Sequence, residues 1–306
     1  MANLQGRNSD RFEEDNWMPP LVLDLTRLVP GPLAVQMLQR VGFRAMRVSA
    51  PGGDMLQQVA PEIYRALQAG KESRTLDLKN REGREQLLEL VKQAAVLIES
   101  NLPGTMERLG VGPEVLRAAQ PKLVYVRMAG FREEKWKQSP GHDLTYLAAA
   151  GLVGRLEPVW RNMQLADLCG AFWTAMAALD GLRRGGGFYE VYLGEAAQTV
   201  SLPSPPFLDG SACCYGIYAA ADGQVALAAL EPHLWQRFCS AAGRENWAAA
   251  AMSPANGENP VYSEICKFFA SRSAREWEKW AGENRIPLRA VKTEPQALAG
   301  APWKVS

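Results

Sequence analysis

The sequence predicts an α/β protein, with an open, doubly wound and mostly parallel sheet followed by a second, smaller α/β domain. Three observations support this prediction. Short β-rich segments alternate with amphipathic helical segments over the first half of the chain. A long apolar helix that ends in three glycines follows, and a hairpin with two helices comes after it. Strand–helix–strand units of this length imply parallel pairing with right-handed crossovers, and 306 residues suffice for two domains.

The first half of the chain supplies the strands and helices of the large domain. Segments rich in Val, Ile and Leu predict strands, and apolar residues at helical spacing predict helices. The expected strands cover 21–28, 43–51, 95–100 and 122–131, and the expected helices cover 31–42, 81–94 and 112–120. Because Rossmann-like sheets bind ligands outside the carboxyl ends of their strands, the segments of interest are 25–30, 49–54, 100–104 and 129–132.

The second half predicts one more core helix and then the small domain. Two arginines and three glycines end a helix over 165–187. Two strands over 213–230 are joined at Asp222-Gly223, a hairpin turn pair. Helices near 231–243 and 260–283 and a strand over 286–293 follow. The expected division is a large Rossmann-like domain at 17–187, a linker at 188–210 that is Pro-rich at its end, a small α/β domain at 211–298 and a tail at 299–306.

Composition and charge exclude several classes of function. The net charge is +1, so no long-range field attracts nucleic acid or an anionic membrane surface. Five cysteines form no CxxC pair and no metal-ligand spacing, which indicates reduced thiols and no metal site. The first residues lack the apolar core of a signal peptide, and no apolar run is long enough to span a bilayer. We expect a cytoplasmic protein with no nucleic-acid and no membrane partner.

The segment SPGHDLTYLAAAG (139–151) places His142 beside Asp143 in a chain with only two histidines. Taken alone, a Gly-His-Asp loop is more often a hydrogen-bonded turn than a catalytic site. The other histidine, His233, has no converging motif and stays unassigned.

Two further segments each carry a single carboxylate. LADL contains Asp167, and ALEP contains Glu231. Each also has an ordinary structural explanation. Asp is a common N-cap residue, and Glu followed by Pro is common where a helix begins.

The order of these motifs along the chain resembles that of a known family. The segments that carry the resemblance run from about residue 20 to about residue 298, and include VLDLTRLVPGPLAVQMLQRVGFRAMRVSAPGGD, SPGHDLTYLAAAG and YAAADGQVALAALEPHLW. They resemble the class III CoA-transferase superfamily (CaiB/BaiF type), closest to its α-methylacyl-CoA racemase branch, with a shortened C-terminus. The resemblance implies four catalytic residues, which are His142, Asp143, Asp167 and Glu231.

The implied activity is racemisation or epimerisation at the α-carbon of an acyl-CoA-like thioester by two-base 1,1-proton transfer. One base removes the α-proton and another returns a proton on the opposite face, so both must exchange protons near neutral pH. An imidazole does so unaided, and a carboxylate does so when burial raises its pKa. His142 and Asp167 are the two expected bases, with Asp143 and Glu231 orienting them. The reaction requires no cofactor, and CoA enters as part of the substrate.

Binding of CoA requires positive groups and hydrogen-bond donors near its phosphates. The expected contacts are Arg47, Lys71, Arg74, Asn101 and Arg108. The chain departs from the family pattern where Ser49-Ala50-Pro51 replaces Glu-Arg-Pro and where Glu72 replaces a basic residue. This predicts weak affinity for CoA or a different acyl thioester, such as one carried on a protein.

Two other functions stay open. CoA-transferases of the superfamily use one Asp as a nucleophile, and Asp167 would take that role. A repurposed or inactive relative would instead bind an acyl ligand or a protein partner without turnover. Members of the family also form interlocked dimers, so the resemblance implies a homodimer.

Overall fold

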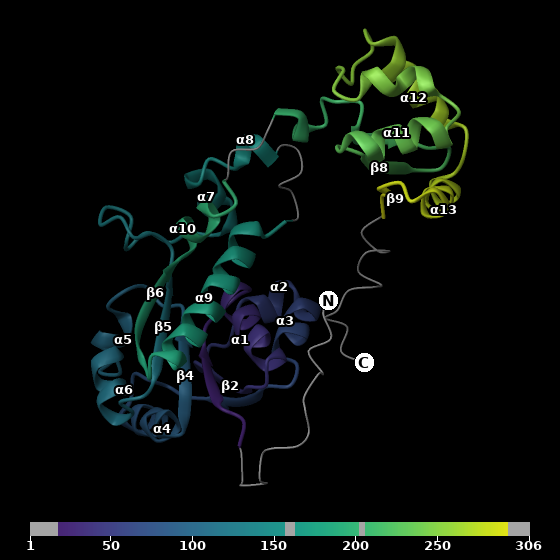
Figure 1. Ribbon diagram of the computed structural model, residues 1–306. Helices are drawn as coiled ribbons and strands as arrows, with labels where there is room; N and C mark the ends of the chain where they lie inside the picture. The colour runs from purple at the N-terminus through teal and green to yellow at the C-terminus, as the bar shows by residue number, and fades with distance from the viewer. Residues whose placement is uncertain (1–17, 157–162, 202–205, 293–306) are drawn as a thin grey trace. The chain divides into compact units, whose positions relative to one another are not determined.

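The computed structural model describes residues 18–156, 163–201 and 206–292. The chain divides into two compact units between Leu202 and Pro203. We call them the large unit and the small unit, and each is described by itself (Figure 1).

A six-stranded, fully parallel sheet forms the centre of the large unit. Its strands lie in the order β3-β2-β1-β4-β5-β6. Their bounds are β1 Leu21–Leu25, β2 Arg44–Ser49, β3 Glu72–Thr75, β4 Ala94–Glu99, β5 Val124–Ala129 and β6 Gly187–Tyr192. The expected doubly wound parallel sheet is confirmed. The order reverses between β1 and β4, and sheets of this order bind ligands at that point, outside the carboxyl ends of the strands.

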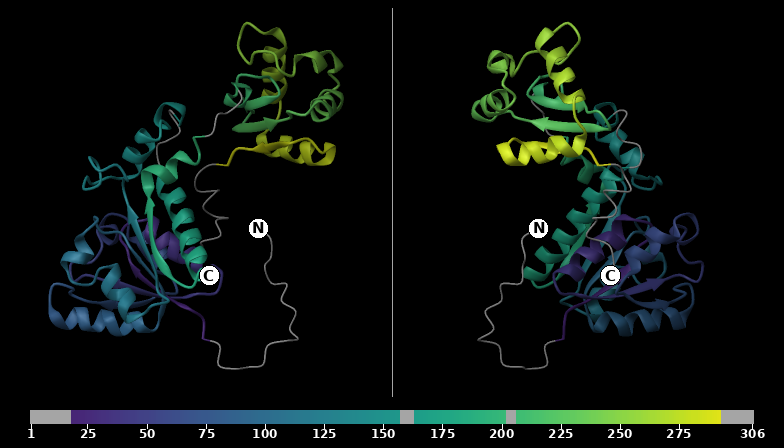
Figure 2. Two further views of the ribbon diagram at one scale, coloured as in Figure 1. Left: turned by 60° about the vertical axis from the view of Figure 1, so that its left-hand side comes forward. Right: turned by 90° about the vertical axis from the view of Figure 1, so that its right-hand side faces the viewer.

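Helices cover both faces of this sheet (Figure 2). Alternate residues of β1 show the two faces, because Val22 belongs to one buried cluster and Leu23 to the other. α1 (Pro30–Arg40) and α9 (Leu165–Arg183) pack in the cluster that contains Val22. The cluster that contains Leu23 is covered by α4 Arg81–Lys92, α5 Thr105–Arg108 and α6 Pro113–Ala119.

Among the described residues, α9 is the one helix whose length and hydropathy would suit a membrane span, which corrects the expectation that no apolar run is long enough. Half of this stretch is buried in the large unit, where α9 packs against α1, β5 and β6. A core helix on a parallel sheet has the same length and composition, so these properties fit the observed packing.

The segment after α9 corrects the expected domain boundary. The glycines at 185–187 have φ between 86° and 148°, the left-handed region. A Cβ on Gly186 would lie 2.9 Å from the carbonyl carbon of Lys122, so only glycine fits where the chain returns to the sheet. β6 then pairs with β5, and α10 (Leu193–Gln198) follows. The expected linker over 188–210 therefore begins too early, because its first half belongs to the large unit.

The remaining helices of the large unit are short and lie in the connections between the core elements. They are α2 Leu56–Val59, α3 Pro61–Gln68, α7 Asp143–Ala149 and α8 Val153–Leu156. Of these, α7 begins at the Gly-His-Asp segment and contacts α9 and α10.

The small unit contains a three-stranded antiparallel sheet in the order β7-β8-β9. Its elements are β7 Tyr215–Ala219, β8 Gln224–Ala228, β9 Leu288–Ala290, α11 Pro232–Ala241, α12 Pro260–Ala270, α13 Ala274–Asn284 and the 3₁₀ helices η1 Pro206–Asp209 and η2 Glu245–Ala250. The expected hairpin is confirmed, with Asp222-Gly223 in its turn. The helical pattern over 260–283 is two helices, because Ser273 caps a new one.

Aromatic side chains fill the core of the small unit. Trp235, Trp247, Trp277, Phe238 and Phe269 are fully buried, and their rings contact one another. The buried indole groups find acceptors, as buried tryptophans usually do: Nε1 of Trp277 donates to the carbonyl of Phe269 at 2.7 Å. The expected tail at 299–306 lies outside the described residues.

Candidate active site

His142 is the residue at which α7 begins. Its backbone N–H donates to Thr145 Oγ1 at 3.0 Å, and that hydroxyl donates to the carbonyl of His142 at 2.7 Å. The backbone of the Gly-His-Asp segment is thus a capped helix start, which fixes the direction in which the His142 side chain leaves the chain. The imidazole itself is exposed.

The glycine before His142 is needed because a large ring packs against it. A Cβ on Gly141 would lie 2.7 Å from Cε1 of Tyr146, one turn further along α7. Tyr146 is buried and packs edge-on against Phe131, with 5.2 Å between ring centroids. This packing holds the first turn of α7 in place, and with it the adjacent residues His142 and Asp143.

Asp143 and Asp167 meet where α7 and α9 begin. Asp143 Oδ1 accepts a hydrogen bond from the backbone N–H of Asp167 at 2.9 Å. The N-cap residue of α9, Gln164, provides no side-chain cap, so Asp143 supplies the acceptor from another helix. Asp167 is the third residue of α9 and not its N-cap. The two carboxyl groups, 24 residues apart in the sequence, thus belong to one buried corner of the large unit.

Burial raises the pKa of both carboxyl groups above the ordinary value. Asp167 is only 8% exposed, and burial raises its pKa to about 7, with a further contribution from the charge of Asp143. Burial also raises the pKa of Asp143, although hydrogen bonds from the backbone of Asp167 and Ala166 act in the opposite direction. Asp167 is therefore a carboxyl group that gains and loses a proton near neutral pH, as an acid–base catalyst must.

The other two expected catalytic residues are less constrained. No hydrogen bond joins the imidazole of His142 to Asp143 or Asp167 among the described residues. Glu231 lies in the small unit, at the N-cap of α11, and is exposed. It is not part of the cluster that the large unit forms by itself. His233, in the first turn of α11, is exposed as well.

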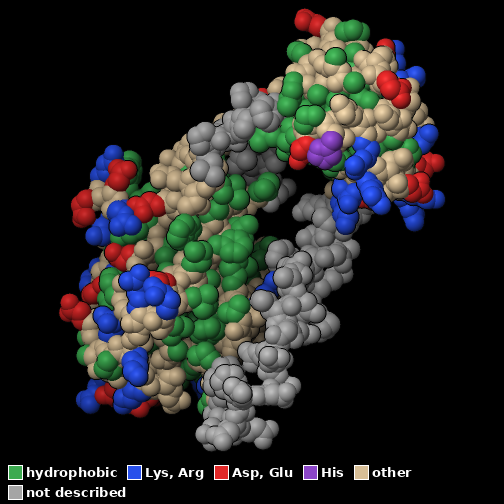
Figure 3. Space-filling view, viewed as in Figure 1, with side chains coloured by type: hydrophobic (Ala, Val, Ile, Leu, Met, Phe, Trp, Pro, Cys, Tyr) green, Lys and Arg blue, Asp and Glu red, His purple; other side chains and the backbone are tan. Residues whose placement is uncertain are grey.

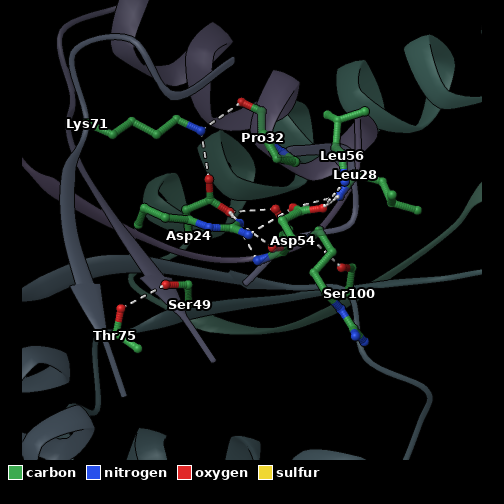
Figure 4. Close-up of polar contacts among 12 residues, drawn as sticks. Asp24, Leu28, Pro32, Ser49, Asp54, Leu56, Lys71, Thr75 and Ser100 are labelled. Atoms are coloured by element: carbon green, nitrogen blue, oxygen red, sulfur yellow. Dashed lines mark hydrogen bonds and ion pairs between the residues drawn. The ribbon is translucent and has the colours of Figure 1, made fainter. Parts of the chain in front are cut away.

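Two of the expected CoA contacts, Arg47 and Lys71, belong to a buried ion-pair network, and Arg47 also lines a cavity of about 170 Å³. Both side chains are buried and already paired with carboxylates, and Figure 4 shows Lys71 beside Asp24. Arg47 contacts Asp24 at 3.2 Å and Asp54 at 3.1 Å, and Lys71 Nζ lies 2.7 Å from Asp24. Two cations and two carboxylates cancel, so this group offers no net charge to a phosphate.

The titration of the two central groups of this network is consistent with ion pairing. Burial alone would raise the pKa of Asp24, but Lys71 and Arg47 outweigh it and lower that pKa. Burial lowers the pKa of Lys71, and Asp24 offsets part of this effect. Such a buried set of charges holds structure together through its hydrogen bonds.

The remaining three expected contacts lie at or near the surface. Arg74 is exposed on β3, and Arg108 is exposed and donates to Thr105 Oγ1 at 2.9 Å. Asn101 follows β4, where its backbone N–H donates to Glu99 at 2.6 Å.

Of these three, Asn101 lines a cavity of about 170 Å³ at the carboxyl ends of β1 and β2, the edge at which such sheets bind ligands. Arg47 lines the same cavity, and so do two further cations, Arg27 after β1 and Lys79 before α4. Neither has a carboxylate partner among the described residues. Neither Arg27 nor Lys79 was expected from the sequence, although Arg27 falls in the 25–30 segment that follows the first strand. Among the described residues no group of three His, Cys, Asp or Glu side chains is placed to hold a metal ion.

Comparison with known proteins agrees with this architecture. Residues 21–306 match the family described as CoA-transferase family III. The chain is 30% identical to human alpha-methylacyl-CoA racemase over 84% of its own length and 72% of that protein. It is 29% identical to succinyl-CoA:mesaconate CoA-transferase of Haloarcula hispanica, over 74% of its own length and 67% of that protein.

Solved structures give the same result for the fold. A crystal structure of the Mycobacterium tuberculosis protein Rv3272 superposes with a TM-score of 0.77 at 29% identity, covering 92% of this chain and 85% of that one. A CAIB/BAIF family protein from Brucella suis, 21% identical, has a TM-score of 0.76 over 93% of this chain and 86% of that one, and shows the shared fold.

The chain belongs to the CoA-transferase family III. This is a family of enzymes that includes both racemases and CoA-transferases, which act on CoA thioesters.

Proposed function

We propose that this protein is a racemase or epimerase that inverts the α-carbon of an acyl-CoA thioester. The observation that carries the proposal is the pKa of Asp167, raised to about 7 in a buried corner that Asp143 shares. A base of a two-base mechanism must accept a proton in one direction and donate it in the other, which such a carboxyl group does near neutral pH.

In the proposed reaction one base removes the α-proton and the C–H electron pair moves onto the thioester oxygen, forming an enolate. The opposite base then donates a proton to the other face of the same carbon, and the thioester carbonyl forms again. Asp167 serves one face of the α-carbon and His142 the other. In each direction of the reaction, the residue that accepts the α-proton begins deprotonated and the opposite residue begins protonated. Asp143 holds the first turn of α9 and keeps the pKa of Asp167 high. We assign Glu231 to a supporting role, as the family pattern implies.

The CoA part of the substrate would occupy the cavity outside β1 and β2. Its volume of about 170 Å³ is below that of sites that enclose a whole drug-sized ligand, so it suits one end of an extended molecule. Arg27 and Lys79 are the cations placed to meet phosphate groups there, whereas Arg47 lines the same cavity but is paired with Asp24 and Asp54. No separate cofactor is needed, because the thioester itself stabilises the enolate.

CoA transfer is the second candidate, since several relatives carry that name. In it, Asp167 would attack the thioester carbon, expel the CoA thiolate and form an acyl anhydride. That step needs an ionised carboxylate, and burial beside Asp143 disfavours ionisation. The raised pKa therefore favours proton transfer over nucleophilic attack.

A homodimer is part of this proposal, and the outer face of α9 supports it. Leu168, Phe172, Trp173, Met176 and Leu179 are between 36% and 56% exposed, and hydrophobic side chains gather along this helix in Figure 3. The twelve residues LCGAFWTAMAAL (168–179) contain no charge. Monomers rarely expose an apolar stripe of this size, so we place a second copy of the chain over it.

We place the enzyme in the cytoplasm. All five cysteines are free thiols, four of them buried, which is typical of proteins from a reducing compartment. Neither nucleic acid nor a membrane is part of the proposed activity, since the net charge of +1 gives no attraction for either.

The test is exchange of the α-proton with solvent. When the purified protein is incubated with a 2-methylacyl-CoA in D₂O, deuterium should enter the α-carbon of the acyl group. Mass spectrometry and NMR measure this incorporation. Asp167→Asn should slow this exchange by at least about a hundredfold, because one of the two bases is gone. Asp180→Asn is the matched control, a half-buried Asp near the other end of the same helix that pairs with Arg183, and should exchange as the wild type does.

Absence of deuterium incorporation by the wild type would refute racemisation. In that case, trapping of an acyl group on Asp167 by hydroxylamine or borohydride, lost in Asp167→Asn, would identify the protein as a CoA-transferase. Neither exchange nor trapping would leave a protein that binds an acyl ligand without turnover.

A further inference from the structure

The turn between β1 and α1 has a strained backbone. Leu28 has φ of +62°, and only one other described non-glycine residue, Arg285 at the end of α13, has a positive φ. A branched side chain is disfavoured in this left-handed region, so surrounding contacts must hold it there. The residues just before Leu28, Thr26 and Arg27, line the cavity that we assign to CoA.

Asp54 supplies the contact that holds Leu28. Its carboxylate accepts hydrogen bonds from the backbone N–H of Leu28 at 3.1 Å and of Leu56 at 3.0 Å, and it pairs with Arg47 at 3.1 Å (Figure 4). One buried carboxylate thereby joins the turn after β1 to the turn after β2.

The rest of the buried network fastens the same turn at other points. Arg47 donates to the carbonyl of Thr26, and Asp24 accepts from the backbone N–H of Thr26 at 3.1 Å. Lys71 donates to the carbonyl of Pro32 at 3.1 Å, in the first turn of α1. Because the four charges cancel, the network's effect on a ligand acts through the shape of this turn and not through its own field.

We infer that Asp54 is a positioning residue for ligand binding, which holds the turn at Leu28 in the conformation that presents Thr26 and Arg27 to the cavity. This rests on the proposed binding of CoA at the carboxyl ends of β1 and β2. Asp54 does not line the cavity, so its effect on the ligand passes through the turn.

The test is a second-site rescue measured with CoA by isothermal titration calorimetry. Asp54→Ala should weaken CoA binding about tenfold or more, because the Leu28 amide loses a charged acceptor and the left-handed turn relaxes. Leu28→Gly alone should change the affinity by less than about threefold, since glycine adopts this φ without strain. Leu28→Gly added to Asp54→Ala should restore most of the lost affinity, because the turn no longer needs to be held.

Asp77→Ala is the matched control. Asp77 lines the cavity and accepts from the backbone N–H of Lys79 at 3.0 Å, but it does not touch the turn at Leu28. Because Asp77 acts on the cavity without the Leu28 turn, adding Leu28→Gly to Asp77→Ala should leave the CoA affinity of Asp77→Ala unchanged within about threefold. If Asp54→Ala does not fold, the same rescue is measured on Asp54→Asn, because asparagine keeps the shape of the side chain and one acceptor oxygen.

Wild-type affinity in both Asp54 variants would overturn the inference, and so would a loss that Leu28→Gly fails to restore. Hydrogen exchange separates this failure from that of the proposed function. The Leu28 amide should lose protection in the Asp54 variant while the Leu23 amide within β1 keeps it. A wild type that does not bind CoA refutes the proposed ligand, and unchanged protection of Leu28 refutes the role of Asp54.

Discussion

The carboxyl group of Asp167 lies where ionisation is costly, and this makes the stability of the fold depend on pH. Its pKa is about 7 in the folded protein, against an ordinary value of 3.8, because burial and Asp143 disfavour the charged form. The folded state therefore binds the proton more tightly than the unfolded state. From the ordinary pKa up to about 7, rising pH removes stability, and above about 7 this loss is complete.

We expect Asp167 to lower the free energy of unfolding by about 3 kcal/mol between pH 5 and pH 8, since about two pKa units at 1.4 kcal/mol each are titrated in that window. Asp167→Asn removes the titrating group, so the free energy of unfolding should change less between these two pH values. Urea unfolding at the two pH values measures it, with Asp180→Asn as the control that keeps the wild-type slope. An unchanged slope in Asp167→Asn would show that another group causes the dependence.

Neighbouring elements of the large unit are joined by a second group of buried charges, centred on Arg127. This side chain, in β5, contacts Glu99 of β4 at 2.6 Å, Glu107 of α5 at 2.7 Å and Glu190 of β6 at 3.7 Å. Glu99 is fully buried, and burial raises its pKa even though Arg127 and Asn101 hydrogen-bond to it. One arginine thus connects three adjacent strands and the helix on their face.

Arg127→Met should destabilise the protein by about 3–5 kcal/mol, because Glu99 is left buried and unpaired. The free energy of unfolding from urea titration measures this loss. Adding Glu99→Gln should recover a large part of it, since the unpaired charge is then gone. Arg81→Met, which breaks an exposed pair with Glu85 on α4, should show no measurable change. Equal effects of the two arginine substitutions would contradict this account of the network.

Elements with a clear hydrophobic pattern were predictable from sequence, and the others were not. β1, β4 and β5 are apolar except for one charged residue each, and they were found within a few residues. β3 reads ESRT and is exposed at every position, so no apolar pattern indicates a strand. β6 begins at the last of three glycines, a pattern typical of the end of a helix and of a domain, and only its pairing with β5 reveals its place.

The candidate site was likewise predictable from the sequence only in part. The motifs identified His142, Asp143 and Asp167, but the contact between Asp143 and the start of α9 depends on where two helices pack. The pairing of Arg47 and Lys71 with buried carboxylates was not expected, because a sequence does not show which cations face a buried carboxylate. No pattern in the sequence distinguishes the two carboxylates concerned, Asp24 and Asp54, from other acidic residues.

At the scale of the whole molecule, the uncharged stripe of α9 predicts association of two copies. Phe172→Glu and Met176→Glu place a charge on residues that are 52% and 56% exposed, so the fold should tolerate them. If the stripe is covered by a second copy, each variant should shift the protein from dimer to monomer in sedimentation or light-scattering experiments. Ile217→Glu in the small unit, 61% exposed, is the control and should leave the dimer intact. A monomeric wild type, or variants that stay dimeric, would contradict the proposal.

α9 carries Asp167 in its first turn and the apolar stripe along the turns that follow. A helix of 19 residues is a stiff rod about 28 Å long, so a shift at one end is transmitted to the other. If two copies of the chain associate over the stripe as proposed, specific activity should consequently fall when the protein is diluted until they separate, and return when it is concentrated again.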